Sequence, residues 1–261
     1  MPYVVLALVA VALFVAQWLL GDVPIAFFAA PMNLLFAVLW LALVVEGYRR
    51  RSKSAVVRFL LSAEATYIAI VVAVAIAIVM GLQSEPTTAS WMVVGGALYV
   101  LTTLSLVILR GWRNEGGVRW RFLITHVGLW LALVAMFFGA PDKQILRMQV
   151  CCTPSRVAVD ERGANHVLDY ELCLEEFDID RAENGSPQQY TATVAVDDRV
   201  VTIAVNSPYS HRYGEDIYLV NYAEDGCVVQ IVREPWKAVS VVGVAMLLLG
   251  AMMLFLRGYK R

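Results

Sequence analysis

Six long apolar segments, separated by shorter polar stretches, dominate the hydropathy pattern of this chain. A helix needs roughly 20 apolar residues to cross a bilayer, and each segment supplies about that length. The segments run near Val4–Leu20, Ile25–Val45, Ala65–Leu82, Trp91–Leu109, Phe122–Gly139 and Ala238–Leu256. The first segment has no basic region before it and is followed directly by another span. It is therefore interpreted as a retained span rather than a cleaved signal peptide.

One long polar stretch, about residues 141–236, lies between the fifth and sixth segments and has an alternating rather than a helical pattern. Gln189–Val196 and Val200–Val205 are rich in β-branched residues and are joined by Asp197–Arg199, which predicts a hairpin. Further strands are predicted at Arg156–Val159, His166–Tyr170, Glu171–Phe177, Asp216–Tyr222 and Val228–Arg233. We expect a small, mostly antiparallel β-domain inserted into a polytopic α-helical membrane protein.

Composition and charge give this arrangement an orientation. Hydrophobic residues make up 59% of the chain and charged residues 16%, and the net charge is −1, so no nucleic-acid partner is expected. Lysines and arginines gather in residues 49–58, 110–121 and 257–261, whereas residues 21–24 and 83–90 contain none. By the positive-inside rule, both termini are expected in the cytoplasm of a bacterium and the β-domain outside its inner membrane, in the periplasm.

The predicted organisation therefore has three regions. Residues 1–140 form a membrane bundle of five spans with cytoplasmic basic loops, and residues 141–236 form the periplasmic β-rich domain. Residues 237–261 form the final transmembrane helix and a cytoplasmic tail.

All four cysteines, Cys151, Cys152, Cys173 and Cys227, fall in the polar stretch. An oxidising compartment permits disulfides there, and Cys173 with Cys227 could join two strands, but the sequence leaves the pairing open. The adjacent Cys151–Cys152 pair could alternatively be a thiol redox site. Because the chain has neither Cys-x-x-Cys nor a histidine at metal-ligand spacing, a zinc site is not expected, and structural or free cysteines are favoured.

His126 is the one histidine within an apolar segment. An ionisable residue at membrane depth is costly and marks a candidate functional site, and imidazole is a common ligand of haem iron. Gly128 and Ala132 offer small surfaces nearby for a helix or a flat ring, while Leu129, Trp130 and Leu133 could supply apolar area around it. Alternatively, His126 could cap the start of its helix or bond to a neighbouring helix.

Two stretches resemble ResB-type proteins of the system II cytochrome c maturation machinery. Arg121–Asp142 resembles the histidine-bearing span that precedes their outer domain. Val205–Tyr222, followed by Val229–Trp236, is similar to the Asn-x-Pro, Tyr-Gly-x-x-Ile-Tyr and Arg-x-Pro pattern that closes that domain. This chain has five spans before a compact domain, where the family has three before a larger one. It also lacks the tryptophan-rich loop of the family's partner subunit, called CcsA or ResC.

The resemblance implies a subunit that helps to carry or present haem across the membrane for attachment to apocytochrome c. His126 would be an axial ligand of a transiently bound haem b, with the haem iron as its metal. Arg119 and Arg121 would be candidate contacts to the propionates, and His211, in a polar turn between strands, a candidate outer contact.

The expected partners are a CcsA/ResC-type membrane subunit, apocytochrome c and the lipid bilayer. Because the attachment chemistry is expected on the partner, no catalytic residue is predicted here, and the chain is not expected to be an enzyme on its own. A second function agrees with the same pattern: a non-catalytic periplasmic docking or scaffold module that the spans anchor to the membrane.

Overall fold

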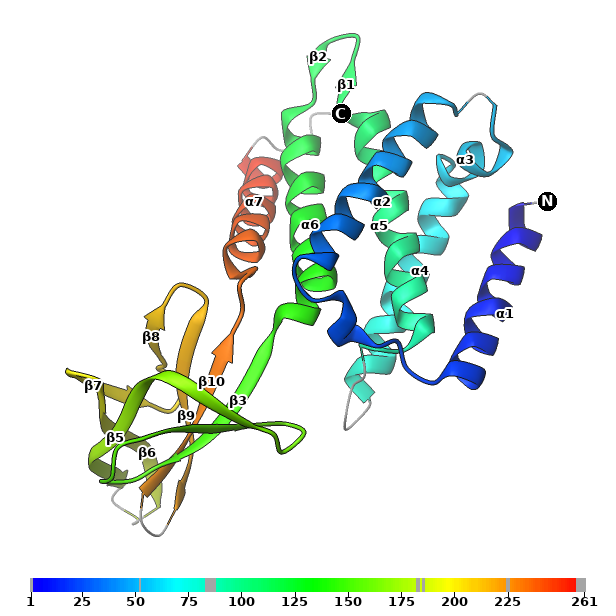
Figure 1. The fold of residues 1–261 in the computed structure, drawn as a ribbon. Helices are drawn as coiled ribbons and strands as arrows, with labels where there is room; N and C mark the ends of the chain where they lie inside the picture. Colours follow the sequence, from blue (N-terminus) through cyan, green and yellow to red (C-terminus); the bar gives the residue numbers. More distant parts are fainter. Residues whose placement is uncertain are drawn as a thin grey trace. The chain divides into compact units, whose positions relative to one another are not determined.

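The computed structural model describes residues 2–51, 53–82, 88–181, 184, 186–223 and 226–256. They divide into a helical unit, Met1–Pro141 with Ala238–Arg261, and a β-unit, Asp142–Lys237 (Figure 1). The predicted C-terminal tail at residues 257–261 lies outside the described residues.

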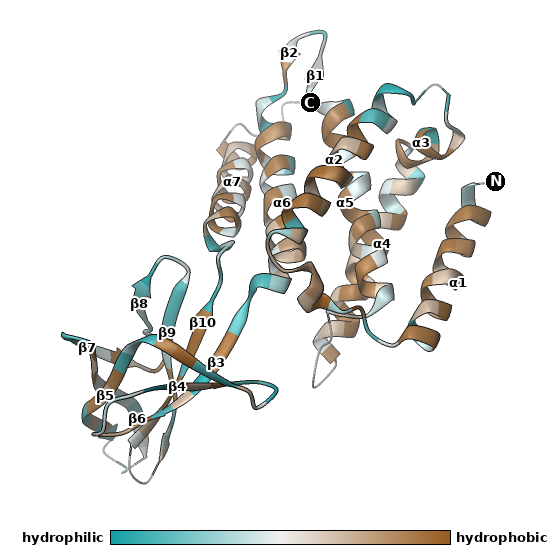
Figure 2. Ribbon diagram, in the orientation of Figure 1, coloured by the Kyte–Doolittle hydropathy of each residue, from teal (hydrophilic) through white to brown (hydrophobic). Residues whose placement is uncertain are grey.

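Within the described residues, the helical unit contains six helices that are long and apolar enough to cross a membrane. They are α1 (Pro2–Leu20), α2 (Met32–Arg49), α4 (Ala63–Leu82), α5 (Trp91–Gly111), α6 (Trp120–Gly139) and α7 (Lys237–Leu256). Apolar residues cover these helices on nearly all sides, and many of their large side chains are exposed (Figure 2). A helix that is apolar all round is typical of a lipid environment. The chain is a helical membrane protein with a β-domain, as its hydropathy predicts.

The polar stretches between the spans contain short elements that hydropathy does not show. η1 (Ile25–Phe28) is separate from α2, which begins only at Met32, after Pro31. The predicted second span, from Ile25, is therefore broken at this proline. The basic loop after α2 contains α3 (Ala55–Leu60), whose first turn is capped by Ser54 through a bond from the Val57 amide.

The β-unit is one antiparallel sheet whose eight strands, within the described residues, follow the order β7-β6-β5-β4-β3-β10-β9-β8. The strands are β3 (Gln144–Val150), β4 (Ser155–Asp160), β5 (Asn165–Arg181), β6 (Pro187–Val196), β7 (Arg199–Ala204), β8 (Tyr209–Arg212), β9 (Glu215–Ala223) and β10 (Gly226–Arg233). β7 also contacts β8 and β9, so the sheet curls towards a barrel. Its core is formed by alternating inward residues such as Leu146, Leu172, Val194, Ile217 and Val229.

The predicted hairpin is present, with β6 pairing with β7, and the strands predicted at Asp216–Tyr222 and Val228–Arg233 pair as β9 and β10. Elsewhere the observed strands differ from the predicted ones. β5 is one continuous strand where two shorter strands were expected. β8 was not predicted at all. It places His211 within an edge strand, so the expectation that His211 lies in a polar turn is wrong.

The chain enters and leaves the sheet through neighbouring strands. β3 follows α6 through the short η2 (Ala140–Asp142), and β10 precedes α7. These two strands pair along their whole length, from Gln144 opposite Arg233 to Val150 opposite Cys227. The β-unit is therefore inserted between two consecutive spans.

Candidate functional site

α6 and α7 pack with their backbones almost in contact. A Cβ added at Gly128 of α6 would lie 2.8 Å from the Gly243 carbonyl oxygen of α7. A Cβ at Gly243 would lie 2.7 Å from the Ala132 nitrogen, and one at Gly250 would lie 3.2 Å from the Thr125 Cα. Small residues allow this approach between membrane helices. The surface predicted at Gly128 and Ala132 is therefore occupied by a helix rather than by a flat ring.

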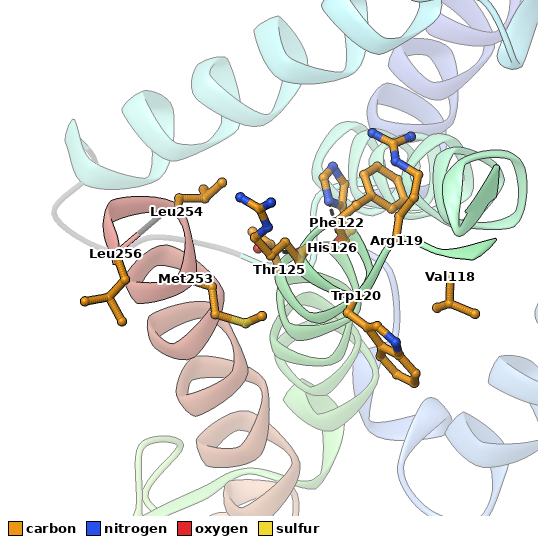
Figure 3. A pocket seen from close by; sticks show the side chains of 10 residues that line it. Val118, Arg119, Trp120, Phe122, Thr125, His126, Met253, Leu254 and Leu256 are labelled. Atoms are coloured by element: carbon orange, nitrogen blue, oxygen red, sulfur yellow. Dashed lines mark hydrogen bonds between the residues drawn. The ribbon is translucent and has the colours of Figure 1, made fainter. Parts of the chain in front are cut away.

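A cavity of about 840 Å³ lies beside the first two turns of α6 and the last turn of α7 (Figure 3). Its volume is in the range of small-molecule and cofactor sites. The predicted site residues His126, Arg119 and Arg121 all line it. The other lining residues are Val118, Trp120, Phe122, Thr125, Met253, Leu254 and Leu256. The described lining is therefore apolar and cationic, and none of it is acidic.

The geometry of His126 fixes which of its nitrogens can bind a metal. Nδ1 lies 2.8 Å from the backbone carbonyl oxygen of Phe122, one turn earlier. A carbonyl oxygen can only accept a hydrogen bond, so Nδ1 carries the proton, and in the neutral ring Nε2 keeps its lone pair. Among the described residues, Nε2 has no hydrogen-bond partner. Metal-bound histidines commonly donate their second nitrogen to a carbonyl in this way.

Arg119, Phe122 and His126 form a continuous stack at the start of α6. The Phe122 and His126 ring centroids are 3.9 Å apart, with their planes inclined by 27°. The Arg119 guanidinium lies over the Phe122 ring, 4.9 Å from its centroid, and Nη1 donates a 3.4 Å hydrogen bond to the Gly111 carbonyl. These contacts hold the imidazole and one positive charge on the same side of the helix (Figure 3).

Arg121 supplies the second positive charge. Its guanidinium has no acidic partner among the described residues. The first turn of α6 adds the partial positive charge of its unpaired backbone N–H groups. This end of the cavity therefore favours an anion, whereas the α7 end is apolar.

Residues 117–230 match the ResB-like family. The match confirms the resemblance predicted from the sequence motifs. It runs from β2 (Gly117–Val118) through α6 and most of the β-unit, and it includes His126, both cavity arginines and His211.

Comparison with curated protein sequences finds no match. Among solved structures, the chain is similar to cytochrome c heme lyase CcmF, with 11% sequence identity and a TM-score of 0.40. The alignment covers 70% of this chain and 33% of that structure, so the chain spans about a third of its length. At this TM-score, the likeness assigns neither fold nor function.

Three further residues of the ResB-like segment do not lie where the sequence placed them. Leu129, Trp130 and Leu133 were expected around His126, but none of them lines the cavity. The Trp130 indole instead donates a 2.8 Å hydrogen bond to Ser105 of α5 and stacks on Trp40 of α2, with ring centroids 6.5 Å apart. Trp130 therefore belongs to the packing inside the bundle.

Phe122 and the α7 residues are the lining residues that sequence reasoning missed. Phe122 precedes His126 by four residues, so helical spacing alone would place the two side chains on one face. Met253, Leu254 and Leu256 of α7 carry no comparable signal, because a uniformly apolar helix does not reveal which face meets its neighbour.

His211 lies in the β-unit and does not line the cavity. Its ring packs against Tyr170, with centroids 4.3 Å apart, and lies 6.2 Å from Tyr209. This placement makes His211 part of the edge of the β-core.

Beside His211, the motif that closes the ResB-like segment builds a buried ion cluster around Glu215. The Glu215 side chain is only 3% exposed and accepts hydrogen bonds from Arg212, at 3.0 Å, and from Arg233. Arg212 also binds Asp169 at 2.6 Å. Burial alone would raise the pKa of Glu215, but the nearby Tyr170 hydroxyl and the hydrogen bonds from Arg233 and Arg212 outweigh it and hold the pKa below its usual value.

Gly214 allows the turn that brings these charges together. Its φ is +72°, and a Cβ there would lie 2.7 Å from the Glu234 carbonyl oxygen. The Tyr-Gly-x-x-Ile-Tyr and Arg-x-Pro motifs are therefore one structural unit of the β-domain.

The four cysteines form no disulfide in this structure. Cys227 is buried in β10, and β3 and β4 lie between it and Cys173 of β5 in the strand order, so these two do not form the pair left open by the sequence. Within the described residues, no group of histidine, cysteine, aspartate or glutamate side chains could hold a metal ion directly.

Proposed function

We propose that this chain is a ResB-like subunit of the system II cytochrome c maturation machinery, which presents haem for attachment to apocytochrome c. The observation that carries the proposal is the state of His126. Its Nδ1 proton is held by the Phe122 carbonyl, its Nε2 lone pair has no described partner, and it lines a cavity with two arginines.

The charge and polarity of the residues that line the cavity support a haem as the ligand. His126 would bind the iron through Nε2, and Arg119 and Arg121 would pair with the two propionates. Phe122, Met253 and Leu254 would contact the apolar part of the macrocycle. The bound haem would supply the vinyl groups that become attached, while this chain would bind, orient and shield the cofactor.

A neutral imidazole suits this role, because it ligates iron without bringing a net charge to membrane depth. The Phe122 carbonyl keeps the ring in the tautomer that leaves Nε2 available. Phe122 also fills the space beside the ring and restricts its rotation. His126 is therefore positioned for a ligand before the ligand arrives.

The topology supports delivery from the cytoplasmic side. The basic loop after α2, the end of α5 and the start of α6 lie at one end of the bundle, where the cavity also lies (Figure 1). By the positive-inside rule this end faces the cytoplasm, which would place the β-domain in the periplasm of a bacterium. A CcsA/ResC-type subunit would supply the second axial ligand and the attachment chemistry.

The test is the absorption spectrum, with pyridine haemochrome, of the chain purified in detergent together with a CcsA/ResC-type subunit. We expect a b-type haem spectrum that His126→Ala abolishes and that added imidazole restores in His126→Gly. Replacing both arginines by glutamine should lower haem occupancy without removing the axial ligand. His211→Ala is the matched control: retained haem assigns it a packing role, and lost haem would make it the outer contact.

Absence of haem from folded chain with its partner bound, or haem retained by His126→Ala, would overturn the proposal.

The second candidate function is the membrane-anchored periplasmic docking module. It is favoured by the β-unit, whose described polar cluster is closed by internal ion pairs rather than open to a substrate.

A further inference from the structure

Three of the four cysteines meet at one place on the β-unit. β4 pairs with β5, with Ser155 opposite Leu172. The chain just before β4 continues alongside β5, because the Leu174 amide donates a 2.9 Å hydrogen bond to the Cys151 carbonyl. In an antiparallel arrangement, a bond between residues 174 and 151 places residue 173 opposite residue 152. The register therefore brings Cys173 of β5 opposite Cys152 of the β3–β4 connection.

The side chains agree with this register. The Cys173 sulfur lies 3.0 Å from the backbone carbonyl oxygen of Cys152. Residues directly opposite on neighbouring antiparallel segments have Cβ atoms about 4.5–5.5 Å apart, and a disulfide needs about 3.5–4.5 Å. Cys152 is exposed and lies in a bend rather than a strand, so a small movement of this connection closes the gap.

The electrostatic environment of Cys173 indicates the same neighbour, Cys152. Burial raises the pKa of the Cys173 thiol most, and the nearby Cys152, Glu175 and Cys151 raise it further, in that order. The larger effect of Cys152 is expected if its sulfur is closer than that of Cys151. Cys173 is therefore the less reactive partner, and the exposed Cys152 would react first with an oxidant in solution.

We propose that Cys152 and Cys173 form a reversible disulfide that fastens the β3–β4 connection to β5. The Cys152 thiolate attacks a small disulfide such as glutathione disulfide, forming a mixed disulfide and releasing one glutathione thiolate. The Cys173 thiolate then attacks the Cys152 sulfur and displaces the second glutathione. Two protein thiols lose two protons and two electrons, and one glutathione disulfide becomes two glutathione thiols.

The other two cysteines have different roles in this scheme. Cys151 is adjacent but opposite Leu174, so it keeps its thiol. Cys227 is fully buried in the core, and burial raises its pKa to about 11, so it stays reduced in the folded chain. The proposed disulfide needs neither haem nor a partner subunit, so its test is independent of the proposed function.

The test uses the full chain in detergent, equilibrated in glutathione buffers of graded redox ratio. Free thiols are trapped under denaturing conditions with a light maleimide, the protein is reduced, and the released thiols receive a heavy maleimide before peptide mass spectrometry. In oxidising buffer we expect the heavy label on Cys152 and Cys173 and the light label on Cys151 and Cys227. In reducing buffer all four should carry the light label.

Two matched variants sharpen the result. Cys151→Ser should leave the heavy label on Cys152 and Cys173 unchanged, whereas Cys152→Ser should remove it from Cys173. Both substitutions fall in the connection between strands, so neither disturbs the core. A light label on Cys173 at every redox ratio, a bond from Cys173 to Cys151 in the unsubstituted chain, or a disulfide between two chains would each overturn the proposal.

Discussion

Replacing Glu215 by glutamine tests whether the buried ion cluster stabilises the β-domain. The substitution keeps the shape of the side chain but removes the charge that accepts hydrogen bonds from Arg212 and Arg233. Breaking a buried ion pair costs about 3–5 kcal/mol. We expect a cost at the lower end of this range, because Arg212 keeps its bond to Asp169 and the Arg233 side chain is 25% exposed. We expect the free energy of opening the β-domain to fall by about 3 kcal/mol.

Cys227 provides the assay within the full chain. Its thiol is inaccessible in the folded β-core, so its rate of alkylation reports how often the domain opens. A loss of about 3 kcal/mol corresponds to labelling faster by roughly two orders of magnitude. Glu171→Gln is the matched control, because Glu171 pairs with Arg156 where both side chains are about half exposed. Such a pair contributes at most about 1 kcal/mol, so labelling should accelerate less than tenfold.

Equal labelling rates for the unsubstituted chain and Glu215→Gln would refute this reasoning. The arginines would then be satisfied by Asp169 and solvent alone. A faster rate in Glu171→Gln than in Glu215→Gln would refute it as well, since it would place the important charge at the surface.

Three further predictions concern the Glu215 cluster and the packing of the membrane helices. Because the folded-state pKa of Glu215 lies below its ordinary 4.5, its contribution is complete above that pH and is lost as pH falls through the lowered value. The difference in urea midpoint between the unsubstituted chain and Glu215→Gln should therefore shrink in acid, as pulse proteolysis can measure. Gly243→Leu should prevent the α6–α7 contact and abolish the monodisperse folded species in size-exclusion chromatography, whereas Val244→Leu, on an exposed position, should not. Asn33→Leu removes a buried 2.8 Å hydrogen bond to the Phe138 carbonyl and should cost about 1 kcal/mol in denaturant titration, whereas Leu34→Ala, on an exposed side chain, should cost less.

The transmembrane helices were predictable because an apolar run of this length has few alternatives. α3 was not, because six residues within a basic loop show no clear periodicity and are stabilised by the Ser54 cap. β8 was missed for a related reason: Tyr209–Arg212 is a short edge strand, held to the core by Tyr209 and by the contact of His211 with Tyr170. Short elements held by tertiary contacts leave little pattern in the chain.

The site was predictable to a similar degree. His126 stood out because ionisable residues are rare within apolar spans, whereas Arg119 and Arg121 were candidates only through the ResB resemblance; the structure brings all three to one cavity. Hydropathy could not assign the α7 lining, because every face of that helix is apolar. Its glycines do mark the contact face, since Gly243 and Gly250 both meet α6. Glu215 was not singled out from the sequence, because its burial depends on its pairing with Arg212 and Arg233 in the folded β-unit.

The pairing of β3 with β10 has a consequence for how such chains can diversify. Because the polypeptide leaves α6 and returns to α7 along two hydrogen-bonded neighbouring strands, the start and finish of the insertion are fixed next to each other. Insertions with adjacent ends are tolerated by their hosts, since their length does not change the distance that the host must bridge. The β-unit can therefore lengthen, shorten or be exchanged for a different domain. The helix pair that carries His126 would keep its geometry throughout, so the membrane helices and the β-unit could evolve independently.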